Sequence, residues 1–178
     1  VQGDGAASAL TDALQSDVRT TGGNGSIVLR STAGSLTLNN GSAPGAASTP
    51  ADDVAISAIG SGNVLLQTLA AGQDITLNAD VLSGTGNISL LAGRDVILNG
   101  TADLRTSNTP QGSGNLDVQA GRDLSQGTGS VLLSTGSYAA ARLAAGGNVT
   151  LGRILLADGT VGITAGAAIL DGDALVSG

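Results

Sequence analysis

Short runs of alternating apolar and polar residues recur along the whole chain. One unit begins with Gly and a small polar residue and continues apolar, variable, apolar. It occurs at residues 25–29, 62–66, 86–90, 114–118, 129–133 and 147–151. Alternation with a period of two is typical of β-strands and not of helices. In each strand the apolar pair, such as Ile88 and Leu90, should face inward, and the residue between them, Ser89, should face outward.

A second unit follows several of these runs. It occurs at residues 72–78, 93–99 and 121–124, with an earlier relative at residues 34–39. One turn of the chain therefore contains two strands separated by a corner, followed by a variable return. Repeats of this kind predict an all-β fold, a right-handed parallel β-helix or a close β-solenoid relative, with about eight rungs spaced by ~4.8 Å.

The repeats run through the chain as one β-solenoid domain, residues 1–178, which we interpret as a segment of a longer rod or a subunit for one. Two polar stretches, at about residues 40–53 and 105–113, predict variable loops. Residues 6–18 have a weak helical pattern, and an Ala-rich strand fits them equally well.

The composition restricts how the interior can be built. The chain has 29 Gly, one aromatic residue, Tyr138, and no Cys, Met, Phe, Trp or His. A globular core without aromatic side chains is difficult to fill, whereas a solenoid stacks Val, Ile, Leu and Ala on the same residues of the next coil. Because 41% of the residues are apolar, disorder is not expected either.

The charge pattern excludes two classes of partner. All 7 basic residues are Arg and all 14 acidic residues are Asp, so the net charge is −7. Neither nucleic acid nor an anionic membrane surface is expected to bind such a chain. The longest apolar runs, such as residues 154–157, are far shorter than the ~18 residues of a membrane span, so membrane insertion is not expected.

Residues 86–100 and their partial repeat at residues 114–124 resemble the repeats of filamentous haemagglutinin and related large secreted adhesins of bacteria. The best match covers about residues 60–151. The resemblance implies a right-handed parallel β-helix, export from a Gram-negative cell, and service as the shaft of an adhesin, biofilm or toxin-delivery protein. No Asn precedes a Pro in this chain, so the Asn-Pro motifs of the family's secretion domain are missing. The segment would then be shaft and not secretion cap.

Polar residues at repeated positions predict columns along the rod. Asn39, Asn78 and Asn99 share the position after the second strand, and the Gly-Asn pairs mark another position. Their amides could bond to the equivalent Asn one coil away and form ladders. The alternative is that each is an isolated turn residue.

The carboxylates allow one metal, calcium, which takes oxygen ligands. The candidate ligands are Asp74, Asp95 and Asp123 in one predicted column, and Asp171 with Asp173. Arg94 and Arg122 adjoin two of the column acids, and their charge disfavours a cation. A ladder in which Arg and Asp neutralise each other is therefore the preferred interpretation, and no other cofactor is expected.

Catalysis has little support in the sequence. Asp52 and Asp53 are the one adjacent acidic pair, and paired carboxylates can act as acid and base. No His, Lys or Cys is available to activate a hydroxyl nucleophile. No catalytic residue is assigned, and a polysaccharide-active enzyme is the least favoured class.

The function expected from the sequence is a structural or adhesive rod outside the cell or on the bacterial surface. Its partners would be neighbouring repeats of the same chain and, through the loops, host or cell-surface ligands. The alternative is a fibre subunit that stacks end to end through open solenoid edges.

Overall fold

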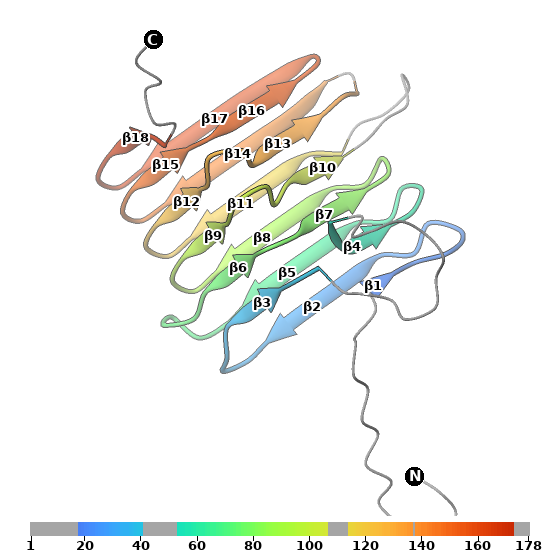
Figure 1. Ribbon diagram of the computed structural model, residues 1–178, viewed down its shortest axis with the longest axis horizontal. Coiled ribbons are helices and arrows are strands. Elements are labelled where there is room, and N and C mark those ends of the chain that lie inside the picture. The colour runs from blue at the N-terminus through green and yellow to red at the C-terminus, as the bar shows by residue number, and fades with distance from the viewer. Residues whose placement is uncertain (1–17, 41–52, 107–113, 137, 173–178) are drawn as a thin grey trace, which may run out of the picture.

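The computed structural model describes residues 18–40, 53–106, 114–136 and 138–172. These residues form eighteen strands and no helix, and nothing in them resembles a membrane-spanning helix. The strands lie in three parallel sheets of six, stacked along one direction (Figure 1). The predicted all-β parallel β-helix is confirmed. Residues 6–17, considered as a helix or a strand, and residues 41–52 and 107–113 of the predicted loops fall outside the described residues. Residues 105 and 106, predicted as the start of the second loop, belong to a strand instead.

The chain visits the three sheets in turn. Sheet A contains β1 (Val18–Arg19), β4 (Val54–Ala58), β7 (Asp80–Ser83), β10 (Leu104–Thr106), β13 (Val131–Ser134) and β16 (Arg153–Leu156). Sheet B contains β2 (Ile27–Ser31), β5 (Val64–Thr68), β8 (Ile88–Ala92), β11 (Leu116–Ala120), β14 (Ala139–Ala145) and β17 (Gly159–Ala165). Sheet C contains β3 (Leu36–Leu38), β6 (Ile75–Leu77), β9 (Val96–Leu98), β12 (Leu124–Gln126), β15 (Val149–Leu151) and β18 (Ile169–Asp171).

Each coil therefore has three strands, and the described residues form six coils, not about eight. In sheet B the register runs through Ile27, Val64, Ile88, Leu116, Ala141 and Val161, which are 37, 24, 28, 25 and 20 residues apart. The variable return contains the strand of sheet A. That third strand and the inserted loops make a coil longer than the sequence estimate assumed.

Two of the alternating units lie in other sheets than the pattern suggested. Residues 129–133 were grouped with the strands of sheet B, but β13 belongs to sheet A, with Leu132 buried and Leu133 half-buried. Residues 147–151 likewise form β15 of sheet C. The predicted inward pair, Val131 and Leu133, is wrong here, because Leu132 and Ser134 are the buried residues of β13. The short interval between Gly114 and Gly129 contains β11 and β12 and leads from sheet B through sheet C to sheet A, so it is only part of a coil.

The interior consists of stacked columns of aliphatic side chains. In β8, Ile88 and Leu90 are fully buried while Ser89 is half-buried, as the alternation predicted. Ile88 has Val64 on one side and Leu116 on the other. Each fully buried aliphatic side chain of this size contributes ~1.5–3 kcal/mol relative to exposure. Stacking therefore buries enough aliphatic surface to stabilise the fold without aromatic residues.

Glycine at the corner before sheet B allows consecutive coils to approach closely. A Cβ added at Gly86 would overlap the carbonyl oxygen of Gly62, and one added at Gly114 would overlap that of Gly86. The obstructing atoms are backbone, which a rotamer change cannot move. Gly62, Gly86 and Gly114 are therefore fixed by the spacing of the coils at this corner.

Replacing Gly86 by Ala is expected to destabilise the protein by about 3 kcal/mol, because the methyl group forces neighbouring coils apart. Gly72→Ala is the matched control, since a Cβ there meets no atom within 4 Å. We expect its effect to stay within about 1 kcal/mol. Urea unfolding followed by circular dichroism measures both variants. Equal stability of the two would contradict the close stacking at this corner.

Candidate functional site

The corner before sheet B carries a column of side-chain acceptors. Asn63 Oδ1 accepts a hydrogen bond from the backbone N–H of Asn87 at 2.8 Å, and Asn87 Oδ1 accepts one from the N–H of Asn115 at 2.8 Å. The column starts with Ser26 Oγ, which accepts from Asn63 N–H at 3.1 Å, and ends where Asn115 Oδ1 accepts from Ala140 N–H at 2.9 Å. The Gly-Asn positions thus form a ladder, but each amide bonds to backbone and not to the next amide.

The corner before sheet C uses the same arrangement with carboxylates. Asp74 Oδ1 accepts from the N–H of Asp95 at 3.2 Å, and Asp95 Oδ1 accepts from the N–H of Asp123 at 3.1 Å. Asp123 Oδ1 then accepts from Asn148 N–H at 2.7 Å. The predicted column of Asp74, Asp95 and Asp123 is therefore present. Each carboxylate accepts a hydrogen bond from a backbone N–H of the following coil.

Two arginines alternate with these carboxylates. Arg94 binds Asp74 through Nε at 2.7 Å and lies 3.3 Å from Asp95 Oδ2. Arg122 binds Asp95 through Nε at 2.9 Å and lies 3.2 Å from Asp123 Oδ2. The Arg122 hydrogen bond holds the pKa of Asp95 below its usual value. The preferred ladder of mutually neutralising Arg and Asp matches this geometry.

A low pKa of Asp95 makes the ladder stabilising above the ordinary pKa of a carboxyl group. This contribution is lost as the pH falls through the lower folded-state value. Both guanidinium groups are largely solvent-exposed, so water and salt screen the pairs and limit their contribution.

The calcium hypothesis gains no support from these positions. Asp74 and Asp95 bind arginines, and the described residues contain no group of three or more acidic side chains arranged for a metal ion. Asp171 lies on β18, and Asp173 falls outside the described residues. Calcium binding by Asp171 and Asp173 stays a prediction.

The Asn ladder predicted after the second strand is confirmed. Asn78 Nδ2 donates to Asn39 Oδ1 at 2.7 Å, and Asn99 Nδ2 donates to Asn78 Oδ1 at 2.9 Å. These are amide-to-amide bonds across three consecutive coils, so the alternative of isolated turn residues is wrong here.

The corner before sheet A contains an acidic cluster that sequence reasoning missed. Asp80 Oδ1 accepts from Asp103 N–H at 2.8 Å, and Asp103 Oδ1 accepts from Val131 N–H at 2.6 Å. Arg105 binds Asp103 and lies 3.4 Å from Asp80 Oδ2. The repeated Ala-Asp pairs at residues 79–80 and 102–103, each before an apolar strand, are the signal that could have found them.

Burial perturbs Asp80 strongly. Only 4% of its surface is exposed, and loss of hydration raises its pKa from 3.8 to about 6. The hydrogen bond from Asp103 N–H and the charge of Arg105 oppose this rise, whereas the charges of Asp103 and Asp53 add to it. The pKa of Asp80 is thus raised, whereas the pKa of Asp95 is lowered.

Buried hydroxyls form another feature that alternation alone concealed. Ser83, Thr106 and Ser134 occupy one inward column of sheet A and are fully or nearly fully buried. Ser83 Oγ donates to Gly62 O at 2.8 Å, and Thr106 Oγ1 donates to Gly114 O at 3.1 Å. These hydroxyls therefore satisfy the backbone carbonyl groups of Gly62 and Gly114, at the corner before sheet B, from inside the rod.

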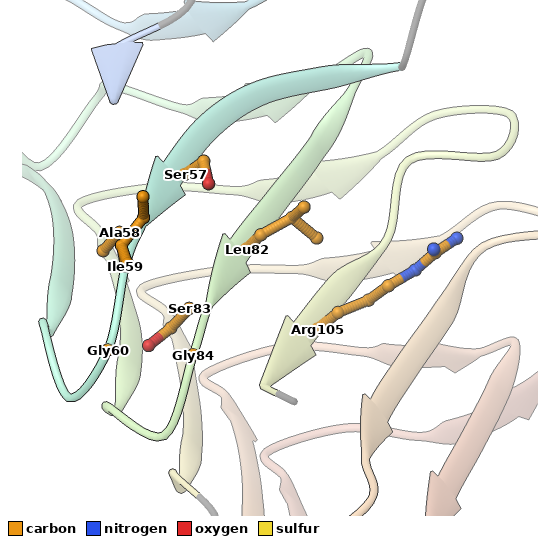
Figure 2. A pocket seen from close by; sticks show the side chains of 8 residues that line it. All are labelled: Ser57, Ala58, Ile59, Gly60, Leu82, Ser83, Gly84 and Arg105. Carbon is orange, nitrogen blue, oxygen red and sulfur yellow. The ribbon is translucent and has the colours of Figure 1, made fainter. Parts of the chain in front are cut away.

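An open hollow of about 410 Å³ lies on the outer side of sheet A. Figure 2 shows Ser57, Leu82 and Arg105 side by side on β4, β7 and β10. The complete lining is Ser57, Ala58, Ile59, Gly60, Leu82, Ser83, Gly84 and Arg105. These eight residues include no carboxylate or other general base. The hollow can offer apolar contact and one guanidinium group, which already binds Asp103.

The adjacent acids considered for catalysis are only partly described. Asp53 Oδ2 accepts a hydrogen bond from Thr101 Oγ1 at 3.0 Å, and Asp52 falls outside the described residues. Asp53 lies near Asp80 and Asp103 in the cluster before sheet A, whereas Asp117 lies in a strand of sheet B. Within that cluster, Asp80 and Asp103 each accept a hydrogen bond from a backbone N–H of the following coil and share Arg105.

Comparison of the chain with protein-family models, with curated proteins and with solved structures finds no match in any of the three.

Asn87→Ala should destabilise the protein by about 1 kcal/mol, because it leaves the N–H of Asn115 without its acceptor. Asn87→Asp is the control: it keeps an acceptor oxygen and copies the role of Asp95 in the neighbouring column. Hydrogen exchange of the Asn115 amide, measured by NMR, reports the local effect. Faster exchange in Asn87→Ala but not in Asn87→Asp is expected. Unchanged exchange in both variants would refute the acceptor role.

Proposed function

We propose that this chain is a segment of a structural rod that acts outside the cell, where it provides reach, rigidity and a scaffold for display. The observation that carries the proposal is the use made of its polar side chains. The amides and carboxylates at all three corners bond the backbone of the next coil. They therefore serve the stacking of coils, and this includes the carboxylates that cluster before sheet A.

The extracellular setting rests on the repeat at residues 86–100, which resembles those of large bacterial adhesins. Small side chains, the complete lack of Cys, and a net charge of −7 suit a long secreted repeat protein. Adhesive contacts would be made by the loops at about residues 40–53 and 105–113, with the rod holding them away from the cell.

Antibodies raised against the purified chain are expected to label intact cells that produce the protein. External protease should remove the label, while an intracellular marker stays protected. Immunofluorescence and immunogold microscopy provide the measurement. Labelling that requires permeabilised cells would contradict the extracellular proposal without bearing on the rod itself.

A fibre subunit is the second candidate, and one observation favours it. The coil formed by β16 to β18 exposes aliphatic residues at inward register positions, with Val161 49% and Ile169 54% exposed. A parallel coil from another copy would cover these side chains and pair the strand edges in all three sheets at once.

Asp171 opposes such stacking. It occupies the register position of Leu151, whose side chain packs against the core. A coil placed over β18 would remove this carboxylate from water, which carries a desolvation cost for a charged group.

Electron microscopy across a range of concentrations distinguishes the two candidates. We expect the wild-type chain to give short rods of one length, and Asp171→Leu to lengthen them by end-to-end association. Leu170→Asp is a matched control that adds a charge at the neighbouring outward position. Long unbranched fibres of the wild-type chain would favour the fibre subunit instead.

A further inference from the structure

The acidic cluster before sheet A differs from the other corners in its charge balance. In the column before sheet C, two arginines alternate with three carboxylates. Before sheet A, Arg105 binds Asp103 and lies near Asp80, and both of these carboxylates are buried. Asp53 adds a third negative charge from the preceding coil, and its backbone oxygen accepts from Asp80 N–H at 2.5 Å.

Both inner carboxylates are held where water cannot screen them well. Asp80 and Asp103 are each only 4% exposed. Their Oδ1 atoms are committed to the N–H groups of Asp103 and Val131, so neither side chain can turn outward without breaking a bond between coils. Arg105 is closer to Asp103 than to Asp80, which leaves Asp80 the less compensated of the two.

We propose that this cluster is a pH-sensitive joint that holds β7 and β10 together more firmly in mildly acidic than in neutral surroundings. Protonation of Asp80 removes one of the buried negative charges. Its Oδ1 keeps the hydrogen bond from Asp103 N–H, while Arg105 continues to neutralise Asp103. At neutral pH the same corner carries an excess of negative charge inside a contact between coils.

The electrostatics of Asp80 agree with this assignment. The charged groups that act on it are Asp53, which precedes β4, and Asp103 and Arg105 at β10. Burial and the two acids outweigh the arginine, so its pKa lies at about 6 and not at 3.8. A pKa raised in the folded state gives stability that is complete below pH 3.8 and is lost as the pH rises through about 6.

The pH-sensitive joint is built from residues within the rod itself. Its pH dependence therefore does not rest on the proposed extracellular function. In a secreted rod that experienced both acidic and neutral surroundings, the stability of the pairing between β7 and β10 would nevertheless change with pH. The change would concern the second to the fourth coil, which contain β4, β7 and β10.

The test is the hydrogen exchange of the Val81 amide, which donates to Asp103 O at 2.9 Å between the two strands. After correction for intrinsic exchange, its protection factor in the wild-type chain should fall about tenfold from about pH 5 to about pH 7.5. In Asp80→Asn it should be independent of pH over this interval and at least equal to wild type at neutral pH. Asp117→Asn, a substitution in sheet B, should keep the wild-type pH dependence.

A second measurement keeps the proposal falsifiable if Asp80→Asn folds poorly. The carboxyl carbon of Asp80, followed by NMR in the wild-type chain, should titrate near pH 6. A midpoint near pH 4, or a Val81 protection factor that does not change with pH in the wild-type chain, would overturn the joint while leaving the proposed rod function untouched.

Discussion

Where a solenoid turns a corner, a backbone N–H of each coil needs an acceptor, and here a side-chain oxygen of the preceding coil provides it. Asn87 does this before sheet B, Asp95 before sheet C and Asp80 before sheet A. The strands between the corners then pair in continuous parallel register. Because unpaired buried donors are costly, this requirement fixes the residue type at the corners as firmly as burial fixes the aliphatic columns.

The same requirement links stability to charge. An amide column satisfies the backbone without a net charge, whereas a carboxylate column adds one negative charge per coil. Before sheet C, Arg94 and Arg122 neutralise that charge at the surface. Before sheet A the carboxylates are more deeply buried and share Arg105. Identical bonding thus produces a lowered pKa for Asp95 and a raised one for Asp80.

Local repetition in the sequence predicted much of this molecule. The alternation around Ile88, the ladder of Asn39, Asn78 and Asn99, and the column through Asp95 all depend on residues at equivalent places in successive coils. The number of coils was overestimated because the strands of sheet A have no constant signature. The acidic cluster was missed for a related reason: the burial of Asp80 depends on which segments lie beside it, and the repeat pattern does not identify those neighbours.

The chain lacks cysteine, so an engineered pair can test the coil-to-coil register directly. Ser89 of β8 lies opposite Asp117 of β11, and Cα atoms of adjacent parallel strands lie ~4.8 Å apart, within the range that a disulfide spans. Ser89→Cys combined with Asp117→Cys should oxidise to a disulfide within the folded chain. Ser89→Cys combined with Gln119→Cys, two residues out of register on the same face, should remain reduced. Crosslinking of the second pair but not the first would contradict the stacked coils described above.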